Sequence, residues 1–164
     1  MKRIALLVFF SISLDAQLEQ SALTLDRLCG AWKLVRIETE RPNGEKLAPY
    51  MGEGAVGTIL YDRSGEMSVQ VMSANRKTPA GGSWEKAPLA ELQELYGSYY
   101  AYHGGFEIVD EGTAIIHRIR GSLRPSDTGT NQKRSARLVE GRLILTSPVG
   151  ANGTFNRITW ERVP

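Results

Sequence analysis

The stretch that decides the fold is LCGAWKLVRIE, residues 28–38. It opens an alternating strand and places Gly30 two positions before Trp32. A glycine lets the chain pass close to neighbouring segments, and a flat indole closes an opening that aliphatic side chains fill poorly. We therefore predict that Trp32 plugs the bottom of a small antiparallel β-barrel.

The rest of the chain continues in short alternating segments. After a first strand at 31–40, seven more are expected at 54–62, 66–72, 100–109, 113–122, 131–139, 142–147 and 154–163. Turn residues separate most of them, as in hairpins. An open meander of this length would leave exposed edges, which closure removes. The sequence thus predicts an all-β fold: an eight-stranded antiparallel up-and-down barrel with one short helix.

Two segments interrupt this pattern. Residues 76–88 are rich in glycine, proline and charge, and a helix of about ten residues is expected after Pro88, a residue that suits a helix start. A long loop in a compact barrel is more often functional than idle, so we expect a lid or lip. At the other interruption, residues 17–27, the apolar spacing favours a short helix or an arm across a barrel mouth.

The first sixteen residues have the composition of a signal peptide. A basic start precedes a ten-residue apolar run, and Ala16 offers a cleavage position. The run is half of the ~20 residues that a membrane-spanning helix needs, so no stable membrane insertion is expected. We predict an exported protein whose barrel domain is 28–164, with an uncleaved anchor or a cytoplasmic location as alternatives.

Charge argues against a nucleic-acid partner. The formal net charge is only +2, from 20 basic and 18 acidic residues spread along the chain. Such a balance gives no field strong enough to hold a polyanion.

Several motifs follow one another at characteristic spacings. They are L-x-G-x-W-x-L at 28–34, Y-x-x-x-G-x-M-S-V-Q at 61–70, YAYHG at 100–104, G-T-x-x-x-H at 112–117, a glycine turn leading to an arginine at 129–134, and W-E-R at 160–162. In this order they resemble the bacterial and fungal lipocalin-like domain family over about residues 28–163. The resemblance implies the barrel fold, and it implies that Arg162 stacks on the indole of Trp32 beside Gly30.

Polar residues with apolar neighbours are the candidates for the barrel interior. His117 shares a strand face with isoleucines, and Arg134 shares one with alanine and leucine, so both should point inward. Alternation alone leaves open which face of three other strands is interior. If their polar faces are inside, the ligand-binding residues are Gln70, Tyr102, His117, Arg134 and Trp160. The alternative is that His117 and Arg134 are core polar residues that only tie strands together.

The sequence contains little that points to covalent or metal chemistry. It has no H-E-x-x-H, C-x-x-C or G-x-S-x-G pattern, so we expect no metal, no cofactor and no catalytic nucleophile. We therefore favour a carrier or sequestration protein for a small hydrophobic ligand. An isomerase or cyclase for a polyketide- or terpenoid-like substrate, using His117 with Tyr102, is one alternative. A protein interaction module with a filled barrel is the other, and the oligomeric state is left open.

Overall fold

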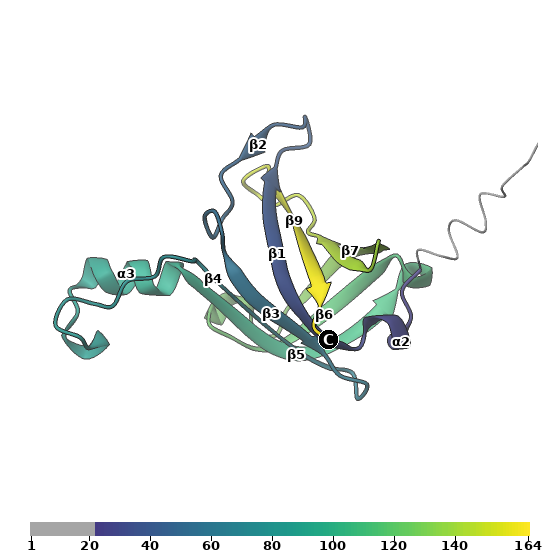
Figure 1. Ribbon diagram of the computed structural model, residues 1–164, viewed down its shortest axis with the longest axis horizontal. Coiled ribbons are helices and arrows are strands. Elements are labelled where there is room, and N and C mark those ends of the chain that lie inside the picture. Colours follow the sequence, from purple (N-terminus) through teal and green to yellow (C-terminus); the bar gives the residue numbers. More distant parts are fainter. Residues whose placement is uncertain (1–21) are drawn as a thin grey trace, which may run out of the picture.

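The computed structural model describes residues 22–164 and shows one antiparallel sheet that closes on itself (Figure 1). Its strands are β1 (Gly30–Glu40), β2 (Lys46–Leu47), β3 (Val56–Tyr61), β4 (Glu66–Met72), β5 (Tyr99–Val109), β6 (Ala114–Ser122), β7 (Asn131–Val139), β8 (Arg142–Thr146) and β9 (Phe155–Arg162). Each long strand pairs with the next, and β1 also pairs with β9. The predicted eight-stranded barrel is confirmed.

The short strand β2 was not expected from the sequence. Its two residues pair only with Thr39 and Glu40 at the end of β1. They extend a hairpin beyond the rim where the sequence indicated only a turn. The eight longer strands form the wall.

The helices lie outside the barrel wall. They are α2 (Leu25–Leu28), α3 (Leu89–Gly97) and the one-turn 3-10 helices η1 (Trp84–Lys86), η2 (Asp110–Gly112) and η3 (Pro125–Asp127). Pro88 is the N-cap of α3, where the sequence placed a helix start. Figure 1 shows α3 and the loop before it projecting away from the barrel. Within residues 22–164, no helix is both long and apolar enough to cross a bilayer.

The end of the N-terminal arm covers the Trp32 end of the barrel. Leu23 and Leu28 are buried there, and the Leu23 amide donates to the carbonyl oxygen of Gly112 at 2.9 Å. The described part of the arm therefore packs under the barrel floor, at the end opposite the open mouth. The predicted signal peptide, 1–16, and residues 17–21 of the arm lie outside the described residues.

Trp32 forms the barrel floor together with Gly30 and Arg162. The indole is 1% exposed, and its N–H donates to the carbonyl oxygen of Leu28 at 2.8 Å. The guanidinium carbon of Arg162 lies 4.2 Å from the indole centroid, in cation-π geometry. Gly30 has a φ of +131°, and a Cβ there would approach the Arg162 Nη1 atom to 2.6 Å. The backbone conformation therefore favours glycine, and a larger residue would also displace the end of the Arg162 side chain.

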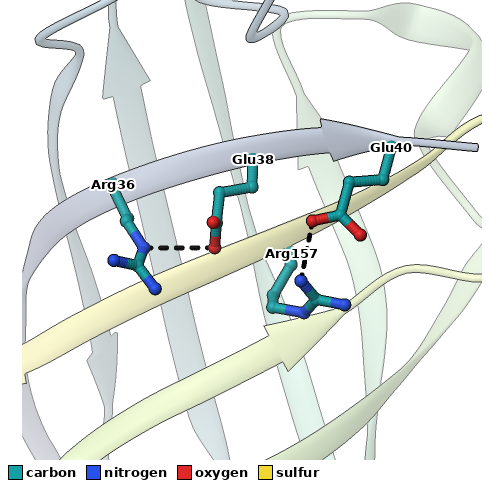
Figure 2. Close-up of polar contacts among 4 residues, drawn as sticks. All are labelled: Arg36, Glu38, Glu40 and Arg157. Atoms are coloured by element: carbon teal, nitrogen blue, oxygen red, sulfur yellow. Dashed lines mark hydrogen bonds and ion pairs between the residues drawn. The ribbon is translucent and has the colours of Figure 1, made fainter. Parts of the chain in front are cut away.

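The seam between β1 and β9 carries ion pairs on its outer face (Figure 2). Arg157 donates to the Glu40 carboxylate at 2.8 Å, and Arg36 donates to Glu38 at 3.1 Å. The side chain of Glu40 is only 11% exposed, whereas that of Arg36 is 60% exposed. The first of these pairs is therefore the better shielded from water.

Candidate functional site

The interior above the floor holds a cavity of about 510 Å³ that opens at the end of the barrel away from Trp32. Strand alternation turns one face of each strand into this space. Its apolar wall is formed by Ile59, Val69, Val71, Leu145 and Ile158. The volume is in the range of small-molecule sites.

Loops form the mouth of the cavity. Tyr50, Arg124, Asp127 and the segment 147–150 line it. The Tyr100 hydroxyl donates to the Asp127 carboxylate at 2.7 Å, and the Arg124 guanidinium carbon lies 4.6 Å from the Tyr100 ring centroid. Burial, together with the Asp127 charge, raises the pKa of Tyr100 to about 12. The mouth is thus polar while the wall is apolar.

His117 lies at the base of the cavity between two tyrosines. Its Nε2 is 2.7 Å from the Tyr61 hydroxyl, and its Nδ1 is 2.7 Å from the Tyr102 hydroxyl. The residue is 1% exposed. Burial, assisted by the positive charge of Arg134, lowers the pKa of His117 to about 3. The ring is therefore neutral at physiological pH, with one N–H and one lone pair.

The two tyrosines differ in what surrounds them. Tyr102 lines the cavity, whereas Tyr61 is packed beneath it against Phe106, with ring centroids 4.9 Å apart. Burial raises the pKa of both hydroxyls, so both stay protonated at neutral pH. The sequence analysis missed Tyr61, although its alternation with Ile59 would have placed it on the inner face.

Arg134 reaches the cavity from β7. It is half-buried, and it donates to the Gln132 side chain and to the carbonyl oxygen of Lys133 at 3.2 Å. Among residues 22–164 no carboxylate lies within ion-pair distance of it. Arg134 therefore lines the cavity without a charged partner among the described residues.

Trp160 lines the same cavity from β9. It is 1% exposed, and its indole N–H has no hydrogen-bond partner among the described residues. Nearby on the strand, Asn156 accepts a hydrogen bond from Thr39 at 2.8 Å. The indole N–H of Trp160 is therefore an unpaired donor that is shielded from the cavity by its neighbours.

Gln70 does not face the interior, which corrects the placement expected from the sequence. On β4 the buried side chains are Met67, Val69 and Val71, so Gln70 points outward and is exposed. The Tyr99 hydroxyl donates to its side chain at 3.4 Å on the outer surface. The other four predicted ligand-binding residues, Tyr102, His117, Arg134 and Trp160, line one cavity.

The loop at 76–88 does not cover this cavity, contrary to the expected lid. Part of it lines a separate cleft of about 900 Å³ together with α3 and the segment 50–53. No residue of 76–88 lines the barrel cavity. The proline and glycine content signalled a long loop but carried no information on its direction.

Metal-ligating side chains do not gather anywhere in the described part of the chain. No group of three or more histidine, cysteine, aspartate or glutamate residues there has the geometry to hold a metal ion. The polar groups at the base of the cavity are instead the neutral His117 and hydrogen-bond donors near it, such as Tyr102 and Arg134.

A family model and a solved structure are similar to this chain. The sequence model described as a lipocalin-like domain matches residues 29–163. The wild-type fluorescent protein UnaG is a similar solved structure, with 10% sequence identity and a TM-score of 0.39 over 85% of this chain and 100% of that chain. No curated protein sequence matches.

Proposed function

The chain belongs to the lipocalin-like domain family, and from this premise we propose that it binds a small, mostly apolar molecule inside its barrel, as a carrier or sequestration protein. The observation that carries the proposal is the cavity of about 510 Å³ with aliphatic walls. A water molecule in the liquid occupies roughly 30 Å³. If each non-hydrogen atom of a ligand takes that volume, the cavity has room for about 17 non-hydrogen atoms. A filled barrel, as an interaction module requires, lacks this space.

An isomerase or cyclase acting on a polyketide- or terpenoid-like substrate is the second candidate. The hydrogen bond of 2.7 Å between Tyr102 and His117 favours it, because such a pair can move a proton. Two features oppose it. Both nitrogens of His117 are already engaged by tyrosines, and a pKa of about 3 makes the ring a weak base. We therefore favour binding over catalysis.

A neutral apolar fluorophore tests the proposal. N-phenyl-1-naphthylamine fluoresces in apolar surroundings, and we expect saturable binding with one site per chain. Val69→Trp places a large side chain in the cavity and should reduce the affinity at least tenfold. Gln70→Trp is the matched control, because the neighbouring residue on the same strand points outward.

The result that contradicts the proposal is binding without saturation. Equal loss of affinity in both tryptophan variants would also contradict it, because the fluorophore would then not be inside the barrel. Turnover of a candidate substrate that His117→Gln abolishes without weakening its binding would favour the enzyme.

A further inference from the structure

Three side chains that line the cavity carry hydrogen-bond donors that the described protein does not use, and they differ in whether a molecule in the cavity can reach them. Trp160 is the first. Its N–H can only donate, and it has no partner although the side chain is almost fully buried. A buried N–H without an acceptor destabilises the folded protein. This N–H has almost no accessible surface, so an acceptor atom of a molecule in the cavity does not reach it.

Arg134 is the second donor. Its guanidinium has five N–H groups and no acceptor, and the hydrogen bonds recorded for it go to neutral oxygens on its own strand. The positive charge of Arg134 acts at the base of the cavity, because this charge helps to lower the pKa of His117. Because Arg134 is only half-buried, water solvates its charge in the free protein, and an anionic group of a ligand could replace that water.

Tyr102 is the third donor, as a consequence of the neutral state of His117. The ring N–H must donate to one tyrosine oxygen while the other tyrosine donates to the ring. If the N–H were on Nε2, the Tyr61 hydrogen would be left unpartnered below the cavity. With the N–H on Nδ1, Tyr61 is satisfied and the hydrogen of Tyr102 points toward the cavity. The second arrangement is favoured because a ligand or water can accept from Tyr102.

From the donors of Arg134 and Tyr102 we propose that the ligand carries an anionic oxygen group, a carboxylate being the simplest, which pairs with Arg134 and accepts from Tyr102. The inference deepens the proposed function and rests on it. The apolar remainder of the ligand lies along the aliphatic wall. Arg134 and Tyr102 disfavour a cationic ligand and a ligand that carries only donors.

Asp127 is the one carboxylate among the described residues that line the cavity, and it does not cancel this preference. It accepts from the Tyr100 hydroxyl at the mouth, beside the Arg124 guanidinium that stacks on the same ring. Its charge therefore has a donor and a cation close by. The base of the cavity keeps its excess of donors.

The test compares three ligands that share one alkyl chain: decanoic acid, 1-decanol and decylamine. Each displaces N-phenyl-1-naphthylamine from the wild-type protein at pH 7.5, below its micelle concentration. We expect decanoate to bind at least tenfold more tightly than decanol, and decylamine to bind most weakly. Removing a hydrogen-bonded charge changes affinity by about 10- to 100-fold. Arg134→Gln should therefore weaken decanoate by that factor and leave decanol within about twofold.

Three further variants keep the test decisive. Arg134→Lys retains the charge and should retain the preference for decanoate. Tyr102→Phe removes only the hydroxyl and should weaken decanoate more than decanol. Arg137→Gln, on the same strand but exposed on the outer face, is the matched control and should change neither affinity.

Equal affinity of the wild-type protein for decanoate and decanol overturns this inference but leaves the proposed function standing. Equal losses for both ligands in Arg134→Gln, with wild-type melting behaviour, overturn it as well. If no ligand displaces the fluorophore and the fluorophore itself does not bind, the proposed function fails. The wild-type comparison decides the inference even if a variant does not fold.

Discussion

Arg162 stacks on Trp32 with its guanidinium carbon 4.2 Å from the indole centroid, which joins the last strand of the barrel to the first. The same guanidinium donates to the carbonyl oxygen of Cys29 at 2.8 Å and to that of Arg27. One side chain thus holds the indole, the start of β1 and the end of α2 together.

Arg162→Ala should destabilise the protein by about 2 kcal/mol, from the loss of the cation-π contact and the hydrogen bonds. For a chain of this length that corresponds to a melting temperature lower by about 4–8 °C. Calorimetry measures it. Arg142→Ala, at an exposed position of β8, is the control and should change the melt by less than 2 °C. An unchanged melt in both variants would show that the stack contributes nothing.

Gly30→Ala should lower the free energy of unfolding more than the same substitution at another glycine with a positive φ. An alanine at position 30 would keep the unfavourable φ of +131°, and its Cβ would lie 2.6 Å from the Arg162 Nη1 atom. Gly44→Ala is the control, because Gly44 has a φ of +87° and open space around it. Combining Gly30→Ala with Arg162→Ala should relieve the steric part, so the two changes will not add. Strict additivity in denaturant unfolding would contradict the close approach.

The stability of the protein should fall between pH 6.5 and pH 5 because of His117. Its pKa falls from an ordinary value of 6.5 to about 3 on folding. In this window the unfolded state binds a proton that the folded state does not, so acidification favours unfolding. The expected slope grows as the pH falls below 6.5 and approaches about 1.4 kcal/mol per pH unit. Urea unfolding at several pH values measures it.

His117→Gln should abolish most of that slope, whatever its effect on stability at pH 7.5. His103→Gln, which changes an exposed histidine on β5, should preserve the slope. A slope that persists in His117→Gln would mean that the buried ring is not the group that titrates.

Glu40→Gln should destabilise the β1–β9 seam more than Glu38→Gln. The Glu40 pair with Arg157 has side-chain exposures of 11% and 31%, against 23% and 60% for Glu38 and Arg36. We expect a loss of about 1–3 kcal/mol for the shielded pair and less than about 1 kcal/mol for the exposed one. Thermal unfolding at low and high salt shows whether Glu40→Gln destabilises the protein more than Glu38→Gln. Equal effects of the two substitutions would contradict it.

The barrel was predictable because its evidence is local. Alternation, turn residues and the glycine before Trp32 each act within a few positions, and closure follows from the need to cover sheet edges. The inward direction of His117 was predictable for the same reason, since its strand neighbours Ile115 and Ile119 are apolar.

Other features depend on the register between distant strands. Gln70 lies on a strand where both faces carry apolar residues, Met72 among the outward ones, so alternation could not identify the inner face. The pairing of Tyr61 with His117 joins β3 to β6. The residues at the mouth, such as Tyr50 and Asp127, come from loops whose direction no periodic pattern describes.

The central claim is that the barrel interior receives a ligand beside Trp160, and tryptophan fluorescence tests it most directly. Titrating 1-decanol into Trp84→Phe should give a saturable change in emission, because Trp160 lines the cavity. The same titration of Trp160→Phe should lose most of that change, since the remaining Trp84 is 67% exposed and Trp32 lies in the floor. A saturable signal that survives in Trp160→Phe and disappears in Trp84→Phe would contradict the account, because the ligand would then bind outside the barrel.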